Sequence, residues 1–137
     1  MSALCLVAAG LTARVAATAF TLAWTHTVEQ VEWREDWRVE PAALVLVAAR
    51  VEGSGAGMDP PDEARLEDGA WVWRPMTRAP SITLRRAPEA EARAGDWRLC
   101  VAGACRPLGA ILAAAAPDAA SAAEAARADP VRLEPCD

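Results

Sequence analysis

The sequence predicts an all-β, mainly antiparallel protein, a small barrel or sandwich of about 7–9 short strands. Three observations indicate this class. Apolar and polar residues alternate over 20–39, a largely apolar run, LVLVAARV, covers 44–51, and a second alternating hairpin covers 97–108. Glycine and proline separate these segments. We expect residues 1–137 to form a single domain, since a chain of this length buries roughly two thirds of its unfolded surface.

The first predicted strand is Leu4 to Ala9, which Gly10 ends, and residues 11–14 are expected to be a connection. The apolar residues 3–13 precede the small-residue pattern Ala17, Thr18, Ala19, as in a cleavable signal peptide. However, no basic residue precedes the apolar run, and cleavage there would leave an odd number of cysteines. We therefore favour an uncleaved segment.

Residues 20–39, FTLAWTHTVEQVEWREDWRV, are predicted to form the central hairpin. With the turn between Gln30 and Val31, the apolar faces of the two strands coincide, and a slip by one residue would place apolar side chains opposite charged ones. This register sets His26 opposite Glu35. An imidazole and a carboxylate on an otherwise apolar face are costly to bury singly but can form a charge-assisted hydrogen bond.

Three interpretations of this pair stay open: a structural pair that fixes the register, a ligand or metal site, and a catalytic base. Glu29 could join His26 and Glu35 in a metal site, although the predicted register places it on the opposite face. A hydrolase would use His26 as base and Ser54 or Thr27 as nucleophile, but the sequence lacks a nucleophile elbow.

After the apolar strand 44–51 comes a glycine-rich loop at 53–61, GSGAGMDPP. Backbone amides at Gly55 and Gly57, with the hydroxyl of Ser54, could form an anion-binding nest. The loop has neither the ending of a P-loop nor the spacing of a dinucleotide fingerprint. An ordinary turn is the alternative.

The rest of the chain continues the β pattern. Further strands are expected at 70–74, 81–86, 97–101, 104–108 and 131–134. A short helix is predicted at 109–116, and an alanine-rich insert or helix at 113–130, where Asp118 is placed to cap a helix start and Pro130 to stop it.

Four cysteines occur in the chain. A turn at Ala102 and Gly103 sets Cys100 opposite Cys105, at a separation compatible with a disulfide. Cys5 and Cys136 then remain as the other candidate pair. A zinc site and four reduced thiols are the alternatives.

Composition excludes some classes of function. The net charge of -5 gives no basic surface for nucleic acid. The apolar runs fall short of the roughly 18 residues of a transmembrane helix. Nothing in the sequence indicates a cofactor. The six tryptophans are expected mainly in the core, with an aromatic ligand platform as the alternative.

The motifs FTLAWTHTVEQVEWREDWRV, GSGAGMDPP and WRLCVAGACRPL resemble the bacterial domain of unknown function family 1850, over about residues 4 to 108 and the ending VRLEPC. Thr27 stands where that family commonly has serine, and the alanine-rich insert departs from its pattern. The residues that match the pattern are His26, Glu29, Glu35, Gly55 and Gly57.

The resemblance implies an association with TRAP transporters of the TAXI type, beside which such proteins are typically encoded. We therefore expect a non-enzymatic accessory or binding protein with transporter subunits, and a small organic acid, as candidate partners. A metal- or ligand-binding module unrelated to transport is the alternative. Many relatives look exported or membrane-tethered, so the periplasm or cell envelope is favoured over the cytoplasm. The expected ligand-binding residues are His26, Glu29, Glu35, Ser54, Gly55 and Gly57.

Overall fold

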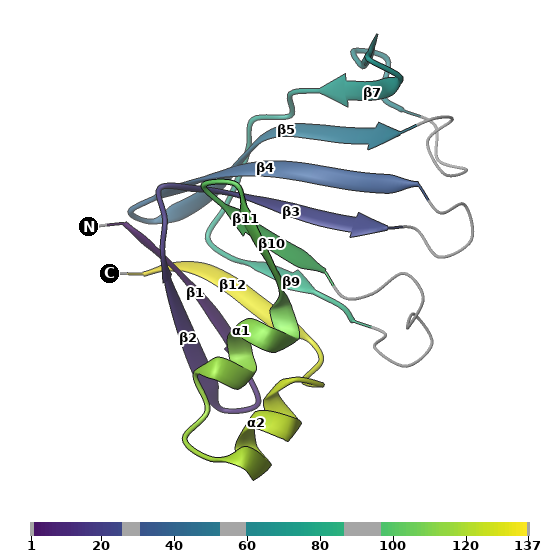
Figure 1. The fold of residues 1–137 in the computed structure, drawn as a ribbon. Helices are drawn as coiled ribbons and strands as arrows, with labels where there is room; N and C mark the ends of the chain where they lie inside the picture. The colour runs from purple at the N-terminus through teal and green to yellow at the C-terminus, as the bar shows by residue number, and fades with distance from the viewer. Residues whose placement is uncertain (1, 26–30, 53–59, 87–96, 137) are drawn as a thin grey trace.

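The computed structural model describes residues 2–25, 31–52, 60–86 and 97–136. Within these ranges the chain forms twelve strands in two antiparallel sheets, with two short helices near the C-terminus (Figure 1). The described part of the sheets contains no closed barrel. The strands are β1 Ala3–Ala8, β2 Leu11–Ala16, β3 Ala19–Thr25, β4 Glu32–Glu40, β5 Ala43–Glu52, β6 Arg65–Glu67, β7 Ala70–Trp73, β8 Thr77–Ala79, β9 Ile82–Leu84, β10 Arg98–Val101, β11 Ala104–Pro107 and β12 Val131–Cys136.

The smaller sheet, sheet A, has the strand order β2-β1-β12-β9 and joins the two ends of the chain. β1 pairs with β12 so that Leu6 lies opposite Leu133, and both side chains are fully buried. A disulfide links Cys5 to Cys136, with the two Cα atoms 5.9 Å apart. The first and last strands of the protein are thus held together both by backbone pairing and by a covalent bond.

The larger sheet, sheet B, has the order β11-β10-β3-β4-β5-β7-β6, and β8 pairs separately with β5. The long strands β3, β4 and β5 form its middle and run side by side, and β7 lies alongside β5 (Figure 1). An irregularity between Asp36 and Trp37 shifts the pairing of β4 with β5. Such bulges increase the local twist of a sheet.

One hydrophobic cluster spans both sheets. Leu4 and Leu6 of sheet A belong to the same cluster as Leu22 and Trp37 of sheet B, and Leu112 of the first helix joins them. Apolar side chains from β1, β12, β3, β4 and the helix therefore bury one another, which is the main term that stabilises this arrangement.

The helices α1 (Leu108–Ala114) and α2 (Ala119–Ala125) pack together beside β2 (Figure 1). The carboxylate of Asp118 accepts a 2.7 Å hydrogen bond from the backbone N–H of Ser121 and so caps α2, as predicted. Arg86, only 8% exposed, donates to the carbonyl oxygens of Ala126 and Ala128 just beyond the last turn of α2. No helix within the described ranges is both long and apolar enough to cross a membrane.

Most predicted strands are confirmed within a residue or two, and so are both disulfides. The predicted connection at residues 11–14 is wrong, because these residues form part of β2. The apolar segment 3–13 thus supplies β1 and the start of β2. The predicted number of strands was too low. Besides β2, it omitted the three-residue strands β6 and β8, whose sequences show no clear alternation of apolar and polar residues.

Candidate functional site

The six predicted ligand-binding residues divide into two groups. Glu35 lies in β4 and is half-buried. The other five lie outside the residues that the structure describes: His26, Glu29, Ser54, Gly55 and Gly57.

The described ends of β3, β4 and β5 that adjoin these five residues in the sequence lie together. Thr25, the last residue of β3, pairs with Glu32, the first residue of β4. The backbone N–H of Glu32 donates a 3.1 Å hydrogen bond to the Oε1 atom of Glu52, the last residue of β5. The strand ends that border residues 26–30 and 53–59 in the sequence therefore lie close together in the part of the chain that the structure describes.

The predicted register of the central hairpin is wrong. Glu35 lies opposite Leu22, not opposite His26, and Trp24 lies opposite Trp33. Leu22 thus pairs with Glu35 instead of Val39, four residues further along the chain. A register shift by an even number of residues keeps every side chain on its predicted face. The alternation therefore excludes a slip of one residue but cannot exclude this shift of four residues.

Glu35 accepts hydrogen bonds from two tryptophans on its own strand. The indole Nε1–H of Trp33 donates to Oε2, and that of Trp37 donates to Oε1, both at 3.1 Å. These residues share a face with Glu35 because side chains two apart on a strand point the same way. Leu22, on one side of the carboxylate, is 0% exposed, and Ala49, on the other, is 2% exposed.

All the aromatic side chains of the protein lie on this face of sheet B, which we call the tryptophan face. Trp24 stacks on Trp97 with ring centroids 5.8 Å apart, and Trp33 meets Trp73 edge-on at 5.7 Å. Trp37 is buried in the core and Trp97 is half-buried and packs against it, whereas the other four tryptophans are half-buried outside the core cluster, so the expectation that the tryptophans mainly fill the core is met only in part. The face comprises Phe20, Trp24, Trp33, Trp37, Trp71, Trp73 and Trp97, together with Glu35.

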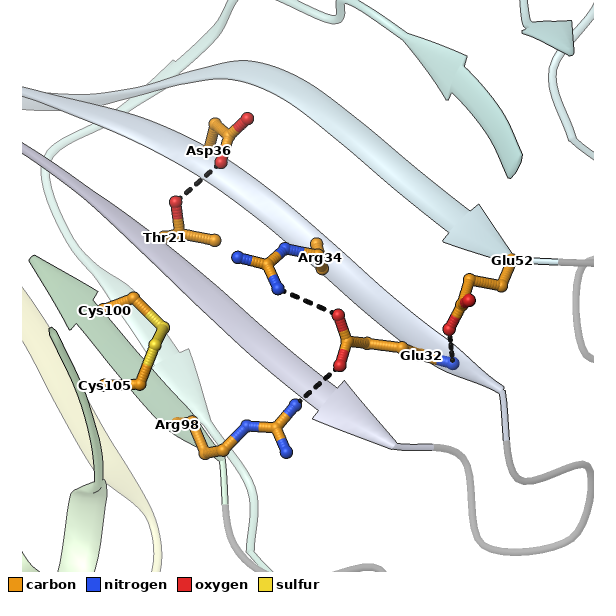
Figure 2. A network of polar contacts seen from close by, with 8 residues as sticks. All are labelled: Thr21, Glu32, Arg34, Asp36, Glu52, Arg98, Cys100 and Cys105. Carbon is orange, nitrogen blue, oxygen red and sulfur yellow. Dashed lines mark hydrogen bonds and ion pairs between the residues drawn. A yellow bond between two sulfur atoms is a disulfide. The ribbon is translucent and has the colours of Figure 1, made fainter. Parts of the chain in front are cut away.

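The opposite face of sheet B carries charged side chains that lie beside one another on neighbouring strands (Figure 2). Glu32 bridges two arginines: its Oε1 accepts from Arg34 and its Oε2 from Arg98, both at 2.9 Å. Arg34 and Arg98 each pair with Ala23 of β3, and Ala23 is only 1% exposed although it lies on this polar side. The bridge therefore spans three strands and covers the small residue between them.

Arg50 extends this row, since it lies directly opposite Arg34 on β5. A hollow of about 370 Å³ is lined by Glu32, Arg34, Asp36, Arg50 and Glu52. We call this surface, with Arg98, the charged face. Among the described residues no ion pair to Arg50 is formed, so its guanidinium group can take an acidic group from outside the chain.

A second hollow of about 340 Å³ lies beside the charged face, near the Cys100–Cys105 disulfide. Thr21 donates a 2.7 Å hydrogen bond to Asp36 at its wall, as Figure 2 shows. Alternation along β4 already placed Glu32, Arg34 and Asp36 on one face. The contribution of Arg98 was missed, because it depends on β10 pairing with β3 rather than on any local pattern.

The family described as Domain of unknown function (DUF1850) matches residues 20–108. The chain belongs to the DUF1850 family. Comparison with curated proteins and with solved structures found no significant match. The DUF1850 match begins in β3 and ends at the first residue of α1, so it contains both the tryptophan face and the charged face of sheet B.

The cysteines of this DUF1850 protein are all in disulfides, which rules out the predicted alternatives of a thiolate zinc site and of reduced thiols. The part of the chain that the structure describes holds no group of three or more metal-ligating side chains. The proposed metal set of His26, Glu29 and Glu35 falls partly outside that part.

Two carboxylates have perturbed proton affinities. Hydrogen bonds and charge from Arg78 and then Arg38 lower the pKa of Glu40 below its usual 4.5. The backbone N–H of Ser121 lowers the pKa of Asp118 in the same direction. Glu40 lies at the far end of β4 from Glu32, and Asp118 caps a helix, so both perturbations are structural rather than part of either face.

Proposed function

We propose that this protein is a non-enzymatic accessory protein of a TAXI-type TRAP transporter, taking part in the uptake of small organic acids, and that its charged face contacts a transporter subunit. Membership of the DUF1850 family supports the setting, through the association that the family resemblance implies. The two disulfides support a place in the periplasm or cell envelope, because such bonds persist mainly in oxidising compartments.

The charged face is the observation that carries the proposal. Its Arg98–Glu32–Arg34 bridge is assembled in the protein alone, so little side-chain entropy is lost when a partner binds. Arg50 beside it offers a guanidinium group that can take a carboxylate in a bidentate geometry. A surface of this kind selects its partner by matched charges.

The predicted ligand-binding residues His26, Glu29, Ser54, Gly55 and Gly57 belong to the same proposal. The strand ends that flank them converge at Glu32 and Glu52, which also line the charged hollow. We propose that these residues take part in the same contact, whereas Glu35 lies on the opposite face of β4.

Uptake of a radiolabelled organic acid by the native host tests the proposal. Deletion of the gene should reduce uptake, and the wild-type gene should restore it. An R34Q/R50Q variant should restore less uptake than the wild type while accumulating to the same level. Arg132→Gln is the matched control, because Arg132 also pairs with a glutamate on a strand but lies in sheet A.

Normal uptake in the deletion strain would overturn the assignment to the transporter. Full rescue by R34Q/R50Q would retain the assignment but remove the charged face from it. Equal loss in R132Q would show a general effect of removing arginines.

A further inference from the structure

We propose that the tryptophan face of sheet B binds a small organic cation, of the methylated ammonium class, at Glu35. This site lies on the other side of β4 from the charged face, so it does not depend on the proposed function. No property of the DUF1850 match assigns it.

The proposed site is built around the negative charge of Glu35. Both of its hydrogen-bond donors are neutral indoles, so they satisfy part of the carboxylate but do not cancel its charge. A carboxylate has about four lone-pair positions, of which these bonds use two. Within the described residues no cation forms an ion pair with it. A half-buried carboxylate on an apolar face is therefore completed by a positive ligand.

Tryptophan rings lie beside this carboxylate. Trp33 and Trp73 pack edge to face at an interplanar angle of 79°, and Trp33 is joined to Glu35 by its indole N–H. Cations bind the faces of indole rings more strongly than those of other aromatic side chains. An indole that donates to a carboxylate also gains electron density on its ring, which favours a cation further.

The surroundings decide what kind of cation fits. Leu22 and Ala49, which flank Glu35 on the neighbouring strands, are buried apolar residues, so they add no polar group beside the carboxylate. Trp33 and Trp73 are half-buried, so part of each ring is open to solvent. A metal ion keeps a tightly bound hydration shell that these apolar surroundings cannot replace, whereas a methylated ammonium group is weakly hydrated and can contact the exposed parts of the two rings.

Titration with choline, followed by the tryptophan indole N–H signals in NMR spectra, tests the proposal. Its neutral analogue 3,3-dimethylbutan-1-ol has the same shape without the charge. We expect choline to shift the Trp33 and Trp37 signals and to bind at least about tenfold more tightly than the analogue. This comparison uses the unmodified protein and needs no variant.

Two variants locate the site. Glu35→Gln should weaken choline binding about tenfold. Asp36→Asn, a neighbouring carboxylate on the opposite face, should leave it unchanged. Equal binding of choline and its neutral analogue, an unchanged affinity in E35Q, or an equal loss in D36N would overturn the proposal.

Discussion

Arg34 of β4 lies directly opposite Arg50 of β5, and Glu32 holds only the first of them. Like charges in this relation destabilise a sheet unless nearby carboxylates offset them. Glu32 is half-buried and contacts two guanidinium groups at once, so it is the residue that makes this row of arginines compatible with the fold.

Glu32→Gln should therefore lower the free energy of unfolding by about 1 kcal/mol, because Arg34 and Arg98 both lose their partner. Urea denaturation at low salt measures this change. At about 1 M salt the difference should shrink, since screening weakens partly exposed ion pairs. Glu124→Gln, an exposed carboxylate on α2, serves as the control. Equal effects of the two substitutions would contradict the bridge.

The two disulfides should contribute unequally to stability. Cys5 and Cys136 are 131 residues apart in the sequence, whereas Cys100 and Cys105 are 5 apart. The loop-entropy relation gives about 5 kcal/mol for the first bond and about 2 kcal/mol for the second. Guanidinium denaturation of the C5S/C136S and C100S/C105S variants should show the larger loss in the first. A larger loss in C100S/C105S would contradict this prediction. It would mean that contacts in the native state, and not loop entropy, determine how much each disulfide stabilises the protein.

Arg86 should prove to be a major stabilising residue outside both faces. Its guanidinium donates at 2.7 Å to the carbonyl oxygen of Ala128 and at 2.9 Å to that of Ala126, and its backbone N–H donates to Asp129. Arg86→Met should lower the free energy of unfolding by roughly 2–4 kcal/mol, because the partly buried carbonyl groups of Ala126 and Ala128 lose their partner. Hydrogen exchange should quicken in α2 before the sheets. Arg127→Met, exposed nearby, should have little effect.

The ion pairs of Glu40 predict part of the acid sensitivity. Its pKa is lowered in the folded protein by Arg78 and Arg38, so its contribution is present above the unfolded pKa, near 4.5, and is lost as pH falls through the folded value. Thermal unfolding measured between about pH 6 and about pH 3 should fall less steeply for Glu40→Gln than for the wild type. Parallel curves for the two proteins would contradict this assignment.

The sequence predicted the face of each side chain in the central hairpin but not its partner. Alternation alone put Glu35 with Trp33 and Trp37, which proved correct. The residue opposite Glu35 depends on where the turn begins. A register shift that keeps Leu22 and Glu35 on the same face leaves the alternation pattern unchanged, so the pattern could not reveal it. Side-chain periodicity therefore reports faces, while register needs the geometry of the turn.

Local sequence patterns could not predict contacts between segments that are far apart in the chain. Arg98 reaches Glu32 across 66 residues because β10 lies next to β3, and no spacing in the sequence encodes that neighbourhood. The cysteines were the exception: once Cys100 and Cys105 formed a hairpin pair, Cys5 and Cys136 remained to join the chain ends. A covalent constraint leaves few alternatives, whereas an arginine has many carboxylates to choose from.

Site-specific photo-crosslinking in the native host shows directly whether the charged face contacts a transporter subunit. A photoreactive residue at position 50 should yield a crosslinked product that contains a subunit of the transporter, and the same residue at position 132 in sheet A should not. Crosslinking at position 132 with none at position 50 would contradict the claim.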